Sequence, residues 1–168
     1  EVPSKAAKYE MESRHSLTQY IPGYTFGDAG TAVLVDRKAR VASVVDSFFF
    51  AESSNWDAAM FPGGGSRHLH DKGAYFFSGD AAALMEPFFT HTKRLLEGFL
   101  KRNDISMNDI EHVFVHQVAE MFLNRVCDDL KIPKSKIEVT IKQYGNVAAA
   151  SLPLALNLRL RGQTPTPG

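Results

Sequence analysis

The chain has 168 residues, of which 44% are hydrophobic, and its 19 Lys and Arg residues balance 19 Asp and Glu residues. This length fits one globular domain and hardly two. The zero formal charge argues against a dedicated nucleic-acid or membrane-surface binder, because both use an excess of basic residues. No apolar stretch approaches the roughly 20 residues that a bilayer crossing needs. A single cysteine, Cys127, excludes an intrachain disulfide, and with no signal-peptide pattern at its start the chain is expected in the reducing cytoplasm.

The first part of the chain is polar and rich in turns, and regular structure is expected only after it. Runs of β-branched and apolar residues predict two neighbouring strands, at Ala32–Asp36 and Val41–Phe50. Pro62 and the three glycines of Gly63–Gly65 then force a loop. This glycine run lacks the Lys-Ser/Thr ending of a phosphate-binding loop, so it is expected to be structural.

Five further elements are predicted from hydrophobic periodicity, and they alternate between helix and strand. They are a helix from Ala81, a strand at Val113–Val115, a helix at Val118–Leu130, a strand at Ile137–Ile141 and a helix at Val147–Leu160. Asp80 is the expected N-cap of the first helix, and Pro133 closes the second. This order implies an α/β fold in which at least part of the sheet is parallel.

Two polar segments follow the two later strands, and each precedes a helix. His116 follows Val113–Val115, and Asn146 follows Ile137–Ile141. Side chains past the carboxyl ends of parallel strands meet at one edge of a sheet, so we expect His116 and Asn146 to lie close together. A neutral imidazole and a carboxamide can both donate hydrogen bonds to an oxyanion without adding charge. The enolate formed beside a thioester carbonyl is such an oxyanion.

Several of these residues also have an ordinary structural interpretation. A lone histidine after a strand is more often a satisfied structural group than a catalyst, and an asparagine after a glycine is ordinarily a turn residue. Cys127 lies in the middle of a predicted helix beside Asp128 and Asp129, whose charges raise the pKa of a thiol. We therefore expect Cys127 to be structural and not a nucleophile.

Two histidine groupings raise the question of a metal site. They are His68, His70 and Asp71, and the pair His112 and His116. A metal site in a protein needs a third and a fourth ligand, and neighbouring residues must hold these ligands in place by hydrogen bonds. His112 and His116 flank a strand instead of sharing a helix face. No metal site is therefore expected.

Four motifs occur in a fixed order along the chain. They are FGDAGTAV at Phe26–Val33, PGGGSR at Pro62–Arg67, the pair His116-Gln117, and YGNVAAASLPLAL at Tyr144–Leu156. The series closely resembles the C-terminal half of β-ketoacyl-acyl-carrier-protein synthase III, a condensing enzyme of the thiolase superfamily. The resemblance runs from about residue 24 to residue 162, and the His-to-Asn spacing matches the family.

The resemblance implies a thiolase-like half: a mixed five-stranded-type sheet with helices on both faces, lacking its last strands. Residues 1–23 would be an irregular segment and residues 24–168 the synthase III C-terminal domain, as a fragment. In the family the nucleophilic cysteine opens a helix of the N-terminal half, which this sequence lacks. The chain alone is therefore expected to be inactive, and the complete protein to be a homodimer.

The resemblance also implies the reaction, a decarboxylative condensation in fatty acid or polyketide biosynthesis. A cysteine takes an acyl group from acyl-CoA, malonyl-ACP loses CO2, and the resulting carbanion attacks the thioester to give a β-ketoacyl-ACP. His116 and Asn146 match the residues that stabilise the enolate. No cofactor is implied beyond these two substrates, and the implied partners are acyl carrier protein and the missing cysteine-bearing half.

The stretch after His116 departs from the family, which usually reads Ala-Asn-Leu-Arg after the His-Gln pair and contacts the pantetheine arm and the carrier protein there. The expected substrate or carrier-protein contacts of this chain are Gln117, Val118, Ala119, Glu120 and Met121. The lost arginine could be replaced electrostatically by Arg125, which is otherwise a solvated surface residue.

Three further features leave alternatives open. Lys131, Lys134 and Lys136 could meet an acidic carrier protein or simply form a solvated helix end. The aromatic clusters Phe48–Phe50 and Phe88-Phe89 could form core or line an acyl channel. The same fold also serves acyl transfer to an alcohol or amine, head-to-head condensation of two acyl-CoAs, or a non-catalytic partner subunit.

Overall fold

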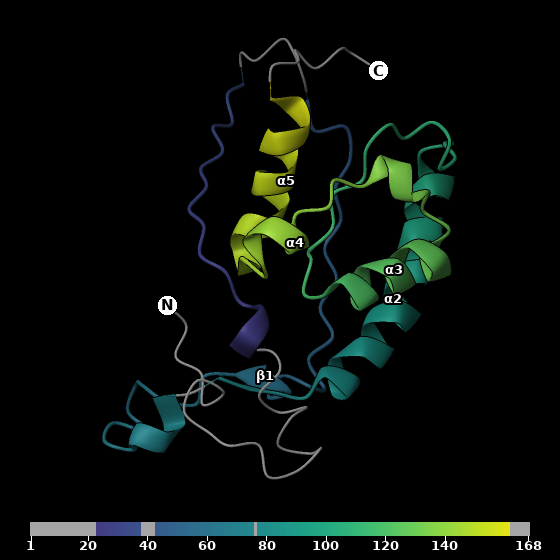
Figure 1. Cartoon of the computed structure of the whole chain (residues 1–168). Helices are drawn as coiled ribbons and strands as arrows, with labels where there is room; N and C mark the ends of the chain where they lie inside the picture. The colour runs from purple at the N-terminus through teal and green to yellow at the C-terminus, as the bar shows by residue number, and fades with distance from the viewer. Residues whose placement is uncertain (1–22, 38–42, 76, 162–168) are drawn as a thin grey trace.

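The computed structural model describes residues 23–37, 43–75 and 77–161 of the chain. Its elements, in chain order, are β1 (Ala59–Met60), the 3-10 turn η2 (Lys72–Tyr75), β2 (Ser78–Gly79), α2 (Ala81–Arg102), α3 (Glu120–Leu130), η3 (Lys134–Lys136), α4 (Ile141–Tyr144), η4 (Ala148–Ala150) and α5 (Ser151–Leu160). The described part is therefore mostly helical. Figure 1 shows α3 packed beside α2, with α4 and α5 together on the other side of the molecule.

The long helix α2 begins where the sequence predicts. The carboxylate of Asp80 accepts hydrogen bonds from the backbone N–H groups of Ala82 and Ala83, both at 3.0 Å, as an N-cap does. Pro87 lies inside this helix and has no N–H to donate to the carbonyl four residues earlier, which is that of Ala83. The side chain of Asn55 donates to this carbonyl at 2.9 Å. A residue outside the helix thus supplies the hydrogen bond that Pro87 omits.

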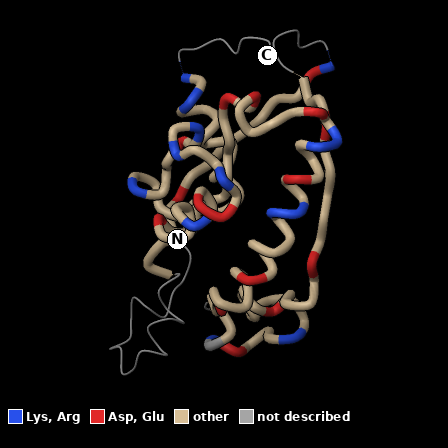
Figure 2. The backbone as a smooth tube through the Cα atoms, turned by 90° about the vertical axis from the view of Figure 1, so that its right-hand side faces the viewer, with Lys and Arg blue, Asp and Glu red and all other residues tan. Residues whose placement is uncertain are grey.

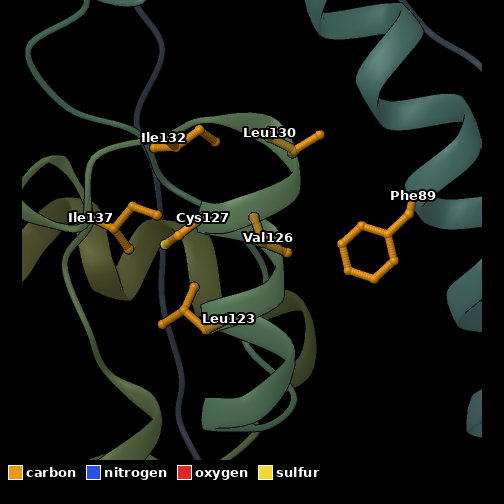
Figure 3. Close-up of a cluster of buried hydrophobic side chains, with 7 residues drawn as sticks. All are labelled: Phe89, Leu123, Val126, Cys127, Leu130, Ile132 and Ile137. Carbon is orange, nitrogen blue, oxygen red and sulfur yellow. The ribbon is translucent and has the colours of Figure 1, made fainter.

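The buried core forms on one face of α3. Leu123, Val126, Cys127 and Leu130 recur at three- and four-residue spacing, which places them on one side of the helix. Ile132 and Ile137 cover this face from the segment that follows, and Phe89 points toward it from α2 (Figure 3). The side chain of Cys127 is part of this core, so the expectation that it is structural agrees with its position.

The prediction of two strands early in the chain is wrong for the residues that the structure describes. Residues 32–36 and 43–50 adopt no regular structure, and residues 41–42 lie outside the described part. Leu34 and Phe49 are 94% and 97% exposed, so the apolar pattern that predicted strands meets no packing partner here. The only sheet among the described residues is the antiparallel pair β1–β2, and not the expected mixed five-stranded sheet with helices on both faces.

The two later predicted strands are reduced to one pair of bridged residues, and this pair confirms their expected parallel orientation. Val113 and Ile137 form an isolated parallel bridge, and the N–H of Val113 donates to the carbonyl of Lys136 at 2.9 Å. The predicted strand at 137–141 is reduced to the single bridge residue Ile137, and Ile141 already begins the short helix α4. The predicted helix at 118–130 begins two residues late, at Glu120, and the one at 147–160 consists of η4 followed by α5.

Charge is spread over the whole described chain. Figure 2 shows Lys and Arg interspersed with Asp and Glu, including along α2, with neither sign gathered over one element. None of the described helices combines the length and the apolar character needed to cross a bilayer. Residues 1–22, which make up nearly all of the segment expected to be irregular, lie outside the described part.

Candidate functional site

Two of the four motifs lie directly against each other. Phe26 and Asn146 form a parallel bridge: the N–H of Asn146 donates to the carbonyl of Thr25 at 2.6 Å, and the N–H of Gly27 donates to the carbonyl of Asn146 at 3.0 Å. These bonds hold the backbone of Asn146 on both sides. The first motif therefore contributes to the candidate site by positioning Asn146.

Gly145 gives the chain the turn that precedes Asn146. Its φ is +69°, a conformation that side chains rarely adopt, and it caps α4. A β-carbon at this position would also lie 2.8 Å from the carbonyl oxygen of Thr25. Glycine is therefore required both by the backbone conformation and by the close approach of the neighbouring segment.

Asn146 is buried, and the two polar atoms of its carboxamide differ in their hydrogen bonding. Its Oδ1 accepts a hydrogen bond from the N–H of Ala148 at 3.0 Å, the pattern of an Asx turn. The Nδ2 group makes no hydrogen bond with another described residue, so its two N–H groups are available to an outside acceptor. The turn interpretation and the donor interpretation of Asn146 thus apply to different atoms of one side chain.

His116 lies at the surface with one edge of its ring turned inward. Its Nδ1 is 3.0 Å from Oγ of Ser151, the buried first residue of α5. Desolvation lowers the pKa of His116, and a hydrogen bond with the backbone of Ala148 partly offsets this by raising it. The net effect favours the neutral ring, which has one N–H donor and one acceptor nitrogen.

The structure brings His116 and Asn146 to one turn, η4: Asn146 binds the N–H of Ala148 where the turn begins, and His116 contacts Ser151 directly after it. Ala148 has a φ of +48°, which is uncommon for a residue with a side chain. Strained backbone of this kind persists where the surroundings impose it, and it clusters at functional sites. Two neutral side chains, each with a hydrogen-bond donor, therefore lie around a single tight turn, η4.

Gln117 is placed inside the protein and not at its surface. It is 1% exposed; its Nε2 donates to the carbonyl of Glu138 at 2.7 Å, and its Oε1 accepts from the N–H groups of Thr140 and Ile141 at 2.9 and 3.1 Å. These bonds tie the residue after His116 to the start of α4, which leads into Asn146. Gln117 thus fixes the separation of the two candidate segments.

The other expected contact residues form the beginning of α3. Val118 is half-buried, and Ala119 is the extended N-cap residue with no side-chain cap bond. Glu120 forms an ion pair with Lys142 of α4, at 2.8 Å, and Met121 is 81% exposed. Of the five expected contacts, Glu120 and Met121 are thus the exposed ones.

The basic residues considered for carrier-protein binding differ in their surroundings. The guanidinium of Arg125 lies 4.1 Å from the ring centroid of Phe89, and its Nε donates to Asp129 at 3.2 Å. The ammonium group of Lys136 donates to backbone carbonyls of the loop before Val113, so it is used within the fold. Lys131 and Lys134 are exposed and are the members of the cluster that face solvent.

Cys127 is unsuited to be a nucleophile in this conformation. Burial raises the pKa of its thiol, Asp128 adds to that effect, and Lys134 opposes it. A raised pKa keeps the group as a thiol, whereas the thiolate is the reactive form.

The remaining candidates hold structural positions or line a surface hollow. The described residues contain no cluster of three His, Cys, Asp or Glu side chains. Gly63 packs against the backbone of Ala74, as expected of a structural loop. Of the aromatic residues, Phe89 is core, whereas Phe48, Phe50 and Phe88 help to line a cavity of about 380 Å³ beside α2.

Sequence reasoning missed Ser151 and Ala148. Both stand within the fourth motif, in the run Ala148–Ser151, where a single hydroxyl among alanines was the only available signal. Neither the contact of Ser151 with His116 nor the left-handed conformation of Ala148 can be obtained from a local pattern.

Comparison with known proteins agrees with the position of these motifs. Residues 100–168 match the family model described as 3-oxoacyl-[acyl-carrier-protein] synthase III C terminal. The chain is 29% identical over 148 residues to a β-ketoacyl-[acyl-carrier-protein] synthase III of Rubrobacter xylanophilus, covering 87% of this chain and 44% of the relative. It is 30% identical over 117 residues to an acetoacetyl CoA synthase of a Streptomyces species, covering 67% and 36%.

A solved structure shows the same relationship. The crystal structure of a 3-oxoacyl-(acyl carrier protein) synthase III from Pseudomonas aeruginosa matches with a TM-score of 0.56 and 26% identity, over 67% of this chain and 33% of that one. The fold and the motifs together are those of the thiolase-like condensing enzymes. Within that class, the chain carries the C-terminal domain of the 3-oxoacyl-ACP synthase III family. It spans less than half the length of the curated relatives that it matches.

Proposed function

We propose that this chain is the C-terminal part of an enzyme that condenses acyl-CoA with malonyl-ACP, with loss of CO2, in fatty acid or polyketide biosynthesis. The observation that carries the proposal is that His116 and Asn146 meet at the turn η4: Oδ1 of Asn146 accepts from the N–H of Ala148, and Nδ1 of His116 lies 3.0 Å from Oγ of Ser151, which directly follows that turn. Two neutral hydrogen-bond donors at one place suit an oxyanion that forms and disappears during the reaction.

The proposed roles follow the electrons of the decarboxylation step. The bond between the carboxylate carbon and the α-carbon breaks, CO2 leaves, and the electron pair moves into the thioester as an enolate. Asn146 Nδ2–H and an N–H of His116 donate to the enolate oxygen. The α-carbon then attacks the acyl thioester of a cysteine, and that cysteine leaves as a thiolate.

The nucleophilic cysteine of this proposal lies outside the present chain. Cys127 is buried in the core and its thiol pKa is raised. We therefore propose that a cysteine-bearing N-terminal half supplies the thiolate, that this chain alone is inactive, and that the complete enzyme is a homodimer. Support comes from the relatives, which extend well beyond the region matched, and from exposed apolar side chains such as Leu34 and Phe49, which a further half would cover.

A second candidate keeps the site and changes the acceptor from malonyl-ACP to a CoA thioester. It is favoured by the similarity to an acetoacetyl CoA synthase, together with Ala119 and Met121 at positions where the family usually has Asn and Arg. Both candidates use the same two donors. They differ in whether an acidic carrier protein must dock beside α3.

The test uses the complete protein that contains this chain, with malonyl thioester decarboxylation as the readout. His116→Ala or Asn146→Ala should each lower the rate by on the order of 10²–10³, as expected for the loss of one oxyanion donor. Thr140→Val is the matched control, because it removes a nearby buried hydroxyl that has no hydrogen-bond partner. Full activity in either alanine variant would overturn the assignment, and rates with malonyl-ACP and malonyl-CoA would separate the two candidates.

A further inference from the structure

His112 and His116 contact opposite ends of the helix α5. Nε2 of His112 accepts a hydrogen bond from Nε of Arg159, in the last turn of the helix, at 3.2 Å, and Nδ1 of His116 lies 3.0 Å from Oγ of Ser151, its first residue. Eight residues of helix span about 12 Å and four residues of extended chain span about 13 Å, so the two lengths match. The segment between the two histidines therefore runs alongside α5, in the direction opposite to the helix.

The alternation of side chains along this segment agrees with that arrangement. Val113 and Val115 pack against the buried core of α3, and side chains two residues apart lie on the same side of an extended chain. His112, Phe114 and His116 consequently share the other side, and the ring centroids of His112 and Phe114 are 6.2 Å apart. The four-residue spacing of the two histidines is thus explained by two contacts with one helix.

We propose that His112 is a positioning residue, which holds the segment leading to His116 against α5 through Arg159 and releases the helix when Nε2 takes up a proton. His112 acts through His116 and not by touching a substrate. The contact itself goes beyond the proposed function, and the inference rests on that function only for its effect on the reaction.

The Nε2 atom of His112 has two polar neighbours with opposite requirements. Nε of Arg159 can only donate, so this contact needs a lone pair on Nε2. The carboxylate of Glu111, whose Oε1 is also 3.2 Å away, can only accept, so it needs a hydrogen on the same nitrogen. A neutral ring that binds Arg159 and a protonated ring that binds Glu111 are therefore alternatives, and one proton on Nε2 decides between them.

The other ring nitrogen carries a hydrogen in both of these forms. Nδ1 of His112 is buried without a hydrogen-bond partner among the described residues, so its cost is the same in each form and does not favour either. A third form, the neutral ring with its hydrogen on Nε2, would relieve Nδ1 but would turn an N–H toward the N–H of Arg159. It could bind only Glu111, whose side chain is 81% exposed and is therefore solvated.

Three charged groups lie on the elements next to His112. Glu111 precedes it on its own segment, Arg159 is the only charged residue of α5, and Lys136 belongs to the segment that pairs with Val113. The ammonium group of Lys136 is occupied by backbone carbonyls of the loop before Val113. The exchange of hydrogen-bond partners therefore takes place between Glu111 and Arg159.

Release of Arg159 would be felt at the candidate site. It leaves the contact of His116 with Ser151 as the hydrogen bond between this segment and α5. Ser151 directly follows the turn η4, whose first N–H, that of Ala148, binds Oδ1 of Asn146. A shift of α5 along the segment therefore changes the position of His116 relative to Asn146.

The first experiment observes the ring of His112 by 15N NMR of the complete protein labelled at histidine, between about pH 8 and pH 5, where histidine side chains change charge. His112→Gln identifies the signals by their loss. At the upper end of this range Nε2 should be unprotonated and Nδ1 should carry the hydrogen, and on acidification Nε2 should gain its proton. A protonated Nε2 already at the upper end would overturn the proposal.

Variants of the partner then test the contact. Arg159→Met removes the donor, so the neutral ring should shift toward the form with its hydrogen on Nε2, bound to Glu111. Arg159→Lys keeps a charged donor and should restore the original form. Arg161→Met is the matched control, because Arg161 is exposed and carries the same charge two residues further along the chain. An unchanged ring in Arg159→Met would contradict the proposal.

Activity of the complete enzyme separates this inference from the proposed function. The amide of His112→Gln offers an acceptor to Arg159 and a donor to Glu111 and takes up no proton. The fall in kcat for decarboxylation on acidification should therefore be smaller in this variant than in the wild-type protein, by on the order of fivefold, the equivalent of about one net hydrogen bond.

Protonation of His116 lowers kcat in both proteins and so does not affect this comparison. Equal falls in the two proteins would show that the release of Arg159 does not reach the site, and the proposal fails. If His116→Ala and Asn146→Ala keep the wild-type rate, the proposed function fails, while the NMR signals still decide whether His112 exchanges Arg159 for Glu111.

Discussion

Gly27 of the first motif packs against the backbone of Tyr144, and Gly145 of the fourth motif packs against the backbone of Thr25. A β-carbon on Gly27 would come within 1.7 Å of the carbonyl oxygen of Tyr144, and one on Gly145 within 2.8 Å of the carbonyl oxygen of Thr25. The two glycines permit the backbone hydrogen bonds that hold Asn146. Their place in the motifs is thus explained by how closely two backbones must approach.

The first prediction concerns this close approach of the two backbones. Gly27→Ala should lower the free energy of unfolding by about 1–3 kcal/mol, the usual cost of forcing extra atoms into a packed site, and should displace Asn146. Urea denaturation measures the stability, and decarboxylation by the complete enzyme measures the displacement. Gly30→Ala is the control, since a β-carbon there meets no atom within 4 Å. Equal effects of the two substitutions would contradict the role given to Gly27.

The second prediction compares two buried polar side chains that lie close together. Gln117→Leu leaves two N–H groups and one carbonyl without their side-chain partner, so it should cost at least about 3 kcal/mol of unfolding free energy. Thr140→Val removes a buried hydroxyl that has no partner, so it should be neutral or slightly stabilising. Urea midpoints of the two variants check both values, and a larger loss in Thr140→Val would show that its hydroxyl is satisfied in solution.

The third prediction concerns the hydrogen bond that replaces the one omitted by Pro87. Asn55→Ala should destabilise the protein by about 1 kcal/mol, because the carbonyl of Ala83 loses its donor. In a Pro87→Ala background the backbone N–H of residue 87 can supply that bond, so the same substitution should cost less. A double-mutant cycle in urea measures the difference. Strictly additive effects would mean that Asn55 and Pro87 act independently.

The fourth prediction is a dependence of stability on pH. The pKa of His116 is lowered in the folded protein from its ordinary value of 6.5, mainly by desolvation. Below that value the unfolded chain binds more protons at this residue than the folded one, so stability falls as the pH decreases and is fully present above it. Urea midpoints should therefore drop less on acidification in His116→Gln than in the wild-type protein. The same drop in both proteins would show that the pKa of His116 is not lowered.

The helices could be predicted from the sequence far better than the strands. In α2 and α3 the hydrophobic spacing and the cap residue Asp80 are local, and most backbone hydrogen bonds of a helix form within the helix itself. A strand needs a neighbouring strand, and residues 32–36 have none among the described residues although their composition is typical of a strand. The same reasoning applies to the site. His116 and Asn146 stand in recognisable motifs, whereas no local spacing predicts the contact between Ser151 and His116.

The fifth prediction concerns the thiol of Cys127, because the proposed reaction needs a thiolate that this chain does not offer. Burial raises the pKa of Cys127, so in the native protein it should react slowly with a thiol reagent such as iodoacetamide, and quickly once urea unfolds the chain. Incubation of the chain with acyl-CoA should give no stable acyl-enzyme by mass spectrometry. Cys127→Ala should lower stability by removing a buried side chain, while malonyl thioester decarboxylation by the complete enzyme stays near the wild-type rate. Rapid acylation of Cys127 in the native chain would reverse the conclusion, since the nucleophile would then lie in this half and the reaction would not require a second one.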